Sequence, residues 1–397
     1  MNRAELHPMK VIEAWPDQDC LNESGRSETI LANARIVTGS ECFCGTVRIR
    51  NGVIADISHG TSAAAEAVDM NGDFLIPGIV DVHTDHLEKH VLPRAGMMWD
   101  PTSAAIAYDV QIIAAGTTTV FDSLTVGAGA STERQRLLPV MLKGIQQARA
   151  HQALKADHFL HLRCDAEDPS LLDIVPQYLD RSDLRFVTIM DDGPHRNLER
   201  FRRIQVYKGR SAAEIENMIA ANKASFARNQ FNRTRLLELC RERRIACASH
   251  DDTTAAHIEE AVAAGSNIAE FPISMEAARA ARAAGMTAIV GAPNIVAGRS
   301  HIGNVSVREL ADLRLFDIIC SDYIPASLLR AIWYLPTMPN GPSLPEAVAM
   351  GTLNPARTFG FPDRGEIAIG KRADLVRVAD IEGPIVRSVW LRGRRML

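Results

Sequence analysis

The run DFLIPGIVDVHTDH, residues 73–86, marks a change in the pattern of the sequence. Short β-rich runs, such as 29–39 and 45–57, precede it and are split by Gly and Asn. Asn51-Gly52, inside the second run, predicts a tight β-hairpin. After Gly78, apolar strands alternate with helical segments, which is typical of a parallel sheet with crossover helices.

Eight strand-like segments follow Gly78. They are Ile79–His83, Thr118–Asp122, His158–Cys164, Phe186–Met190, Ile245–Ser249, Asn267–Glu270, Thr287–Val290 and Phe316–Ser321. Helical segments lie between them, including 104–115, 134–150, 212–228, 254–264 and 275–284. Eight such units predict an α/β fold, a (β/α)8 TIM barrel. An open doubly wound sheet is the alternative, but no Gly-rich phosphate motif follows the first strand to favour it.

The β-rich pattern returns near the C-terminus, in residues 365–379 and 384–397. We therefore predict a small β-sandwich domain formed by both chain ends, from residues 29–77 and 362–397. The barrel would occupy residues 78–361, and residues 1–28 would form an N-terminal extension. A length of 397 residues suits one barrel of about 250 residues with a smaller attachment.

The composition is that of an ordinary globular protein, with 46% hydrophobic and 23% charged residues. The net charge of −4 gives no overall attraction to nucleic acid or to an anionic membrane. No apolar run is long enough for a membrane span, and the first thirty residues lack the features of a secretory signal. Seven cysteines without a C-x-x-C pair indicate a reducing compartment, so we expect a cytoplasmic protein with a small-molecule partner. The oligomeric state stays open, a homo-oligomer included.

Polar side chains recur where the predicted strands end. Alternation along the first strand would put Asp81, His83 and Asp85 on one face. Others follow later strands: His161, Arg163, Asp165, Asp192, His250, Glu270 and Asp322. A single His or Asp at a strand end is usually structural, but active sites of such barrels lie at this end. Acids gathered at one rim repel each other unless a cation neutralises them, so the set predicts a divalent metal site.

Three stretches carry a resemblance to a known family: residues 77–90 (PGIVDVHTDHLEKH), 291–310 (GAPNIVAGRSHIGNVSVREL) and 321–329 (SDYIPASLL). They resemble the amidohydrolase superfamily, and within it the hydrolases of phosphonate degradation. The resemblance covers roughly residues 30–397. It implies a metal-dependent hydrolase that releases diphosphate from a ribosyl alkylphosphonate triphosphate.

The resemblance also implies roles for residues of this chain. The implied metal ligands are His83, Asp85, Asp165, Asp192, His250 and Asp322, and Asp322 would also act as the general base. They would hold one or two divalent ions, zinc first, with manganese or iron as alternatives. Asp165 stands where the family usually has Glu, and Asp192 where it more often has His, with His195 three positions further on. Glu270 occupies a position where many relatives place a second His, and its role is open.

A triphosphate substrate requires basic groups around it. The candidates for substrate binding are Lys89, Arg94, Arg163, Lys208, Arg299 and His301. Arg163 should point in the same direction as Asp165, whereas Arg94 and Arg299 stand in Gly-containing loops with backbone N–H groups to offer. Two other functions remain open. One is hydrolysis of a C–N bond in a cyclic amide or similar small molecule, and the other is a catalytically inactive relative, which the Asp192 departure favours.

Overall fold

The computed structural model describes residues 28–127, 132–300 and 303–397. The predicted N-terminal extension thus lies outside the described residues, apart from Glu28, which begins the first strand. In the described ranges, none of the helices combines the length and the apolar character that a bilayer span requires.

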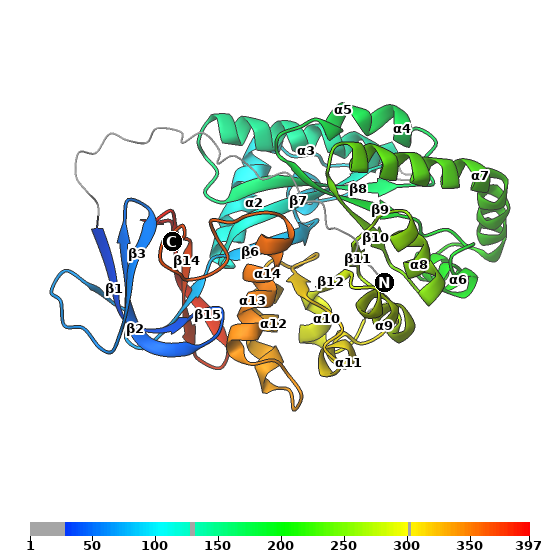
Figure 1. The fold of residues 1–397 in the computed structure, drawn as a ribbon. Helices are drawn as coiled ribbons and strands as arrows, with labels where there is room; N and C mark the ends of the chain where they lie inside the picture. The colour runs from blue at the N-terminus through cyan, green and yellow to red at the C-terminus, as the bar shows by residue number, and fades with distance from the viewer. Residues whose placement is uncertain (1–27, 128–131, 301–302) are drawn as a thin grey trace.

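Eight parallel strands form the barrel (Figure 1). They are β6 (Ile79–Thr84), β7 (Thr117–Val126), β8 (Asp157–Asp165), β9 (Leu184–Met190), β10 (Ala246–His250), β11 (Ile268–Glu270), β12 (Thr287–Gly291) and β13 (Ile318–Cys320). Each strand pairs with the next one along the chain, and a parallel bridge between Thr84 and Asp322 joins the last strand to the first. The predicted barrel is confirmed, and the open doubly wound alternative is wrong because its strand order would differ.

Helices surround the barrel. The longer ones are α2 (Pro101–Ala114), α3 (Thr132–Ala150), α6 (Leu198–Tyr207), α7 (Ala212–Glu242), α8 (Ala255–Ala263), α9 (Met275–Ala283), α12 (Ser327–Tyr334) and α13 (Leu344–Gly351). The shorter ones are α1 (Leu87–Val91), α4 (Leu171–Ile174), α5 (Pro176–Leu179), α10 (Ala292–Ala297), α11 (Val307–Asp312), α14 (Leu353–Thr358) and the 3-10 turn Leu335–Thr337. Helix α7 runs well past the predicted end at residue 228, because Leu236 and Cys240 continue its buried face and no Gly or Pro interrupts it.

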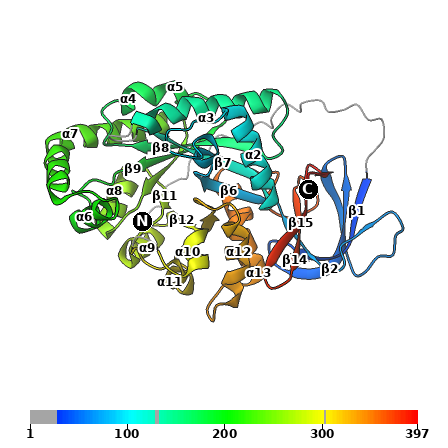
Figure 2. The same cartoon turned by 180° about the vertical axis from the view of Figure 1, so that it is seen from behind.

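The second sheet is built from both ends of the chain (Figure 2). Its strands are β1 (Glu28–Val37), β2 (Cys42–Arg50), β3 (Val53–His59), β4 (Val68–Asp69), β5 (Phe74–Pro77), β14 (Leu375–Asp380), β15 (Pro384–Leu391) and β16 (Arg394–Arg395). The antiparallel pair β5–β14 joins the two chain ends. The hairpin expected at Asn51-Gly52 connects β2 to β3, and both residues have positive φ, 52° and 77°, as a type I′ turn requires. The domain boundaries stay a prediction.

Aromatic side chains fill the part of the barrel opposite to the candidate site. Phe121, Phe159 and Phe186 point inward from three neighbouring strands. Phe359 and Phe361, which follow α14, pack against them, with ring centroids 4.9 Å apart for both Phe121–Phe359 and Phe186–Phe359. This packing leaves the other end of the barrel, where the strands finish, for polar groups.

An ion network anchors the C-terminal segment to the start of β8. The Asp157 carboxylate accepts hydrogen bonds from Arg364 and Arg372, both at 2.7 Å. Burial alone would raise the pKa of Asp157, but the neighbouring guanidinium groups hold it well below its usual value. The network therefore stays charged across the physiological range.

His158, the next residue of β8, lies buried between two carboxylates. Its Nδ1 is 3.0 Å from Asp122 Oδ2, and its Nε2 is 3.1 Å from Asp109 Oδ1. Burial alone would lower the pKa of His158, but the two carboxylates raise it to about 9. The folded protein therefore binds this proton more tightly than the unfolded chain, in which a histidine has a pKa of about 6.5.

This difference predicts a pH-dependent stability. The protonated His158 should contribute about 3 kcal/mol of unfolding free energy. The contribution is complete below about pH 6.5 and is lost as the pH rises through about 9. Urea unfolding between pH 6 and pH 9.5 should show a steeper loss of stability in the wild type than in His158→Gln. Equal pH dependence in the two proteins would contradict this assignment.

Candidate metal centre and active site

The end of strand β6 is irregular, and this irregularity directs His83 toward the barrel interior. Val80 and Val82 pack inside the barrel with Phe121 and Phe159, so strict alternation would turn His83 outward. The pairing of β6 with β7 shifts register between Asp81 and Thr84, and a bulge of this kind re-aims a side chain. The alternation predicted along Asp81, His83 and Asp85 therefore does not run through the whole strand.

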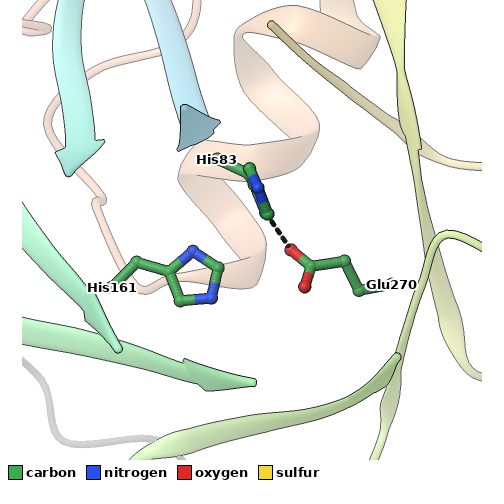
Figure 3. A group of neighbouring side chains, drawn as sticks. All are labelled: His83, His161 and Glu270. Atoms are coloured by element: carbon green, nitrogen blue, oxygen red, sulfur yellow. Dashed lines mark hydrogen bonds and ion pairs between the residues drawn. The ribbon is translucent and has the colours of Figure 1, made fainter. Parts of the chain in front are cut away.

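His83, His161 and Glu270 meet inside the barrel mouth (Figure 3). All three are buried, and each offers a ligand atom within 4.8 Å of the others. His83 Nδ1 lies 2.7 Å from Glu270 Oε1. In the neutral ring this bond puts the proton on Nδ1 and leaves the lone pair on Nε2, the arrangement that a metal ligand needs.

The electrostatics of this group depend on burial and on the His–Glu contact. Burial alone would lower the pKa of His83, but Glu270 raises it above its usual value. Burial would raise the pKa of Glu270, but the charge and hydrogen bond of His83 hold it well below its usual value, so the carboxylate is ionised. Burial lowers the pKa of His161 far enough to keep its ring neutral. Hydroxyl groups of Ser123 and Thr188 orient this ring, at 2.9 and 2.7 Å.

Two buried atoms of this group fit a cation. His83 Nε2 and Glu270 Oε2 have no hydrogen-bond partner among the residues that the structure describes. A buried lone pair without a partner is costly, and a histidine nitrogen beside a carboxylate oxygen is a donor set that zinc, manganese and iron accept. His83 and Glu270 therefore fit a divalent ion, and His161 would exchange one of its hydroxyl contacts for it. Of the ligands that the sequence predicts, only His83 belongs to this group.

A second group lies at the ends of β9 and β10 and consists of Asp192, His250 and Asp251. Within the described ranges, neither ring nitrogen of His250 has a hydrogen-bond partner. The guanidinium of Arg200 contacts both acids of the group: it donates to Asp251 Oδ2 at 2.5 Å and lies 3.6 Å from Asp192 Oδ1. This group therefore already contains a positive charge supplied by the chain.

Asp322, the predicted base, lies where the barrel closes. Its backbone N–H donates to the His83 carbonyl at 2.9 Å, and its own carbonyl accepts from the Asp85 N–H at 3.1 Å. Its φ of 55° is in the left-handed region, as are those of Asp251 (53°) and Phe271 (55°), which also follow barrel strands. Backbone strain of this kind is characteristic of functional sites.

The Asp322 carboxyl lies at the wall of a cavity. Burial raises its pKa above the usual value, although nearby His83 opposes the rise. Asp322 lines a cavity of about 200 Å³ together with Arg163, His250 and Gly291. A Cβ at Gly291 would lie 3.3 Å from Asp322 Oδ2, so this glycine leaves room for the carboxylate.

Asp85 pairs with an arginine. Arg163 Nη1 lies 3.5 Å from Asp85 Oδ2. In the part of the chain that the structure describes, Asp85 Oδ1 and Arg163 Nε have no hydrogen-bond partner. Asp85 belongs to neither of the two groups above, and its role as a metal ligand stays a prediction.

Asp165 and His195 lie in a third, more acidic region. Burial, and then the charge of Asp192, raise the pKa of Asp165 to about 6. Burial, and then the charge of Asp165, raise the pKa of nearby Glu167 to about 7. His195 Nε2 lies 3.2 Å from Asp191, not beside Asp192. Glu167 Oε1 accepts a 2.7 Å hydrogen bond from the Asn222 amide of α7. Glu167, Asp191 and His195 thus form a separate group of ligand-type residues.

The predicted substrate-binding residues are placed differently from one another. Arg163 lines the cavity. Lys89 is exposed but near it, since its Nζ donates to the carbonyl of Tyr323 at 3.1 Å. Arg94 and Arg299 are exposed on loops, and Lys208 is exposed at the far end of α6. His301 lies outside the described residues.

The sequence did not single out two residues of this region, Asp251 and Arg200. It placed His161 on one face of its strand with Arg163 and Asp165 but gave it no role. Asp251 directly follows His250. Arg200 has no signal in the local sequence, because its contacts with Asp192 and Asp251 depend on the tertiary fold.

This barrel, with histidines and carboxylates at its mouth and a sheet made from both chain ends, is the fold of a large class of hydrolases. The Amidohydrolase family model matches residues 221–396. Solved structures of similar fold include N-acetyl-D-glucosamine-6-phosphate deacetylase from Mycobacterium smegmatis, with a TM-score of 0.62, 18% identity, and coverage of 93% of this chain and 100% of that one. Dihydropyrimidinase from Brevibacillus agri gives a TM-score of 0.60 with 14% identity, over 94% of this chain and 95% of that one.

The sequence also matches curated proteins. Alpha-D-ribose 1-methylphosphonate 5-triphosphate diphosphatase from Escherichia coli K12 is 38% identical over 378 residues, which is 92% of this chain and 100% of that protein. Adenine deaminase from Nitratidesulfovibrio vulgaris is 50% identical over 48 residues, only 12% of this chain and 8% of that protein. The chain therefore belongs to the amidohydrolase superfamily, and it is a hydrolase. The predicted resemblance is confirmed.

Proposed function

We propose that the protein is a metal-dependent diphosphatase that releases diphosphate from a ribosyl alkylphosphonate triphosphate. The observation that carries this proposal is the 38% identity to the E. coli diphosphatase, which extends over the whole of that protein. A small phosphorylated substrate is consistent with a cavity that has Arg163 at its wall. We place the enzyme in the cytoplasm, in phosphonate catabolism; the absence of disulfides among the six cysteines that the structure describes supports a reducing compartment.

The chemistry follows from the residues at the barrel mouth. Release of diphosphate from a triphosphate requires cleavage of the innermost P–O–P linkage: water adds to phosphorus, the bridging bond breaks, and diphosphate leaves. Asp322 is the base that we assign to the proton of the attacking water. The Arg163 guanidinium is the cation that we assign to the phosphate oxygens. A divalent ion held by His83, His161 and Glu270 would supply charge neutralisation and make water more acidic.

The ligand set predicted from the sequence gains two residues, His161 and Glu270, and of the six predicted ligands only His83 belongs to the same group. Glu270, whose role was open, is proposed as a ligand beside His83. Its Oε1 contacts the His83 ring, and its buried Oε2 has no hydrogen-bond partner among the described residues. Zinc remains the first choice, with manganese or iron as alternatives, because a mixed histidine and carboxylate set does not discriminate sharply among them.

Hydrolysis of a C–N bond is the second candidate function. The short adenine deaminase match favours it, and so do structural neighbours that include a deacetylase and a dihydropyrimidinase. Hydrolysis of a C–N bond would require a cavity whose polar groups bind an amide or a ring. Arg163 in the cavity wall favours an anionic group instead.

Phosphorus NMR of the triphosphates, together with proton NMR of the amide, distinguishes these functions. The protein would be incubated in turn with ribosyl methylphosphonate triphosphate, with ATP and with a cyclic amide such as dihydrouracil, each with added Zn²⁺. We expect diphosphate from the phosphonate triphosphate, at a higher kcat/KM than from ATP. Turnover of the amide alone would overturn the proposal in favour of C–N hydrolysis, and inertness toward all three would favour the inactive relative.

A further inference from the structure

Arg200 occupies an unusual position for an arginine of a surface helix. It belongs to the first turn of α6, and its side chain is only 9% exposed. The side chain of Asn197 caps the helix by accepting from the Arg200 backbone N–H at 2.9 Å. This cap fixes where the helix begins, and so fixes the direction from which the guanidinium approaches the barrel mouth.

The guanidinium connects the two acids that flank His250. It donates to Asp251 Oδ2 at 2.5 Å and pairs with Asp192 Oδ1 at 3.6 Å. Asp251 is also largely buried, whereas the Asp192 side chain is 54% exposed. One oxygen of each acid is therefore already in contact with a fixed positive charge, while Asp251 Oδ1 lies 3.8 Å from His250 Nδ1.

The group of His83, His161 and Glu270 contains no such contact between an acid and a guanidinium among the described residues. The Glu270 carboxylate is paired with the His83 ring, and within the described ranges no arginine or lysine forms an ion pair with it. Among the residues that the structure describes, the second oxygen of Glu270 and His83 Nε2 have no hydrogen-bond partner. A divalent ion could therefore enter there without displacing a guanidinium, whereas beside His250 it would meet a like charge held within a few ångströms.

We infer that this chain holds a single divalent ion, at His83, His161 and Glu270, and that the Arg200 guanidinium takes the place of a second ion beside His250. The inference depends on the proposed function in one respect: it requires a divalent ion at His83, His161 and Glu270. It also gives a physical reason for Asp192, since an acid at this position pairs with Arg200 where a histidine could not. Arg200 is then a positioning residue, which holds Asp192 and Asp251 and neutralises their charge.

Counting bound ions tests this inference without any substrate. The full-length protein would be stripped with a chelator, reloaded by dialysis against excess Mn²⁺, freed of unbound metal and analysed for metal content. We expect one Mn²⁺ per wild-type chain, and an electron paramagnetic resonance spectrum of an isolated ion. Arg200→Met should bind two. The double variant Asp192→Asn with Arg200→Met should return to one, since the uncovered site then lacks one of its acids.

Arg202→Met is the matched control, because Arg202 lies on the same helix but is exposed and pairs with Glu216. It should bind one ion, as the wild type does. Two ions in the wild type would overturn the inference, whatever the variants do and whether or not Arg200→Met folds. A folded Arg200→Met that still binds one ion would also overturn it. A wild-type protein that binds no ion would refute the metal centre at His83, His161 and Glu270. This outcome differs from binding of two ions, which would refute only the role inferred for Arg200.

Discussion

Asp322→Asn is expected to lower kcat by about 10²–10⁴-fold, the range that a positioned general base contributes. The amide has nearly the same shape as the carboxylate but cannot accept a proton from water. The position should tolerate the change, because the contacts that fix it are made by its backbone, through the His83 carbonyl and the Asp85 N–H. Burial raises the pKa of the Asp322 carboxyl, which makes it a stronger base than an exposed aspartate.

The experiment must distinguish two roles of Asp322, general base and metal ligand, because Asp322 is also among the predicted metal ligands. Diphosphate release, metal content and the thermal midpoint would be measured on the same preparations of wild type and variant. Asp312→Asn is the matched control, because Asp312 is an exposed acid of α11. A variant that keeps its metal and its fold but loses turnover supports the base. Loss of the metal would indicate a ligand instead, and unchanged turnover would refute both roles.

The sequence pattern was sufficient to predict the barrel because its signals are local. Each strand is an apolar run of a few residues bounded by helical segments, and β6 to β13 lie where these runs predict them. The paired chain ends could be inferred because the β-rich pattern disappears at Gly78 and returns after residue 364. The length of α7 was underestimated, because its second half is held by the burial of Leu236 and Cys240, which only the packed fold reveals.

The site was predictable at the level of the strand ends but not of the individual contacts. Which strand-end side chains converge depends on register and tilt, and the irregularity at the end of β6 changes the direction of His83. His161 lies in the middle of β8, four residues before the strand ends, so the sequence placed it on the face of Arg163 and Asp165 without giving it a role in metal binding. Arg163 with Asp85, and Arg200 with Asp251, join segments that are distant along the chain, and no spacing rule connects them.

Glu270→Gln is expected to weaken binding of the divalent ion by more than about 100-fold, beyond the 10–100-fold typical of groups that only support a ligand. The glutamine carbonyl can still accept the hydrogen bond from His83 Nδ1, so the change removes a charge without opening a cavity. The thermal midpoint of the metal-free protein should therefore change little, while the metal-dependent rise in that midpoint should disappear.

Comparison with a matched variant makes this result specific to the barrel mouth. Glu259→Gln removes an acid from the exposed face of α8 and should bind the ion as the wild type does. Titration of Zn²⁺ into the three metal-free proteins measures the affinities directly. If Glu270→Gln binds the ion as tightly as the wild type, the buried Oε2 of Glu270 is not a ligand atom. The metal would then have to be sought among the other ligands that the sequence predicts, such as Asp85, His250 and Asp322, and the single-ion centre inferred from Arg200 would lose its basis.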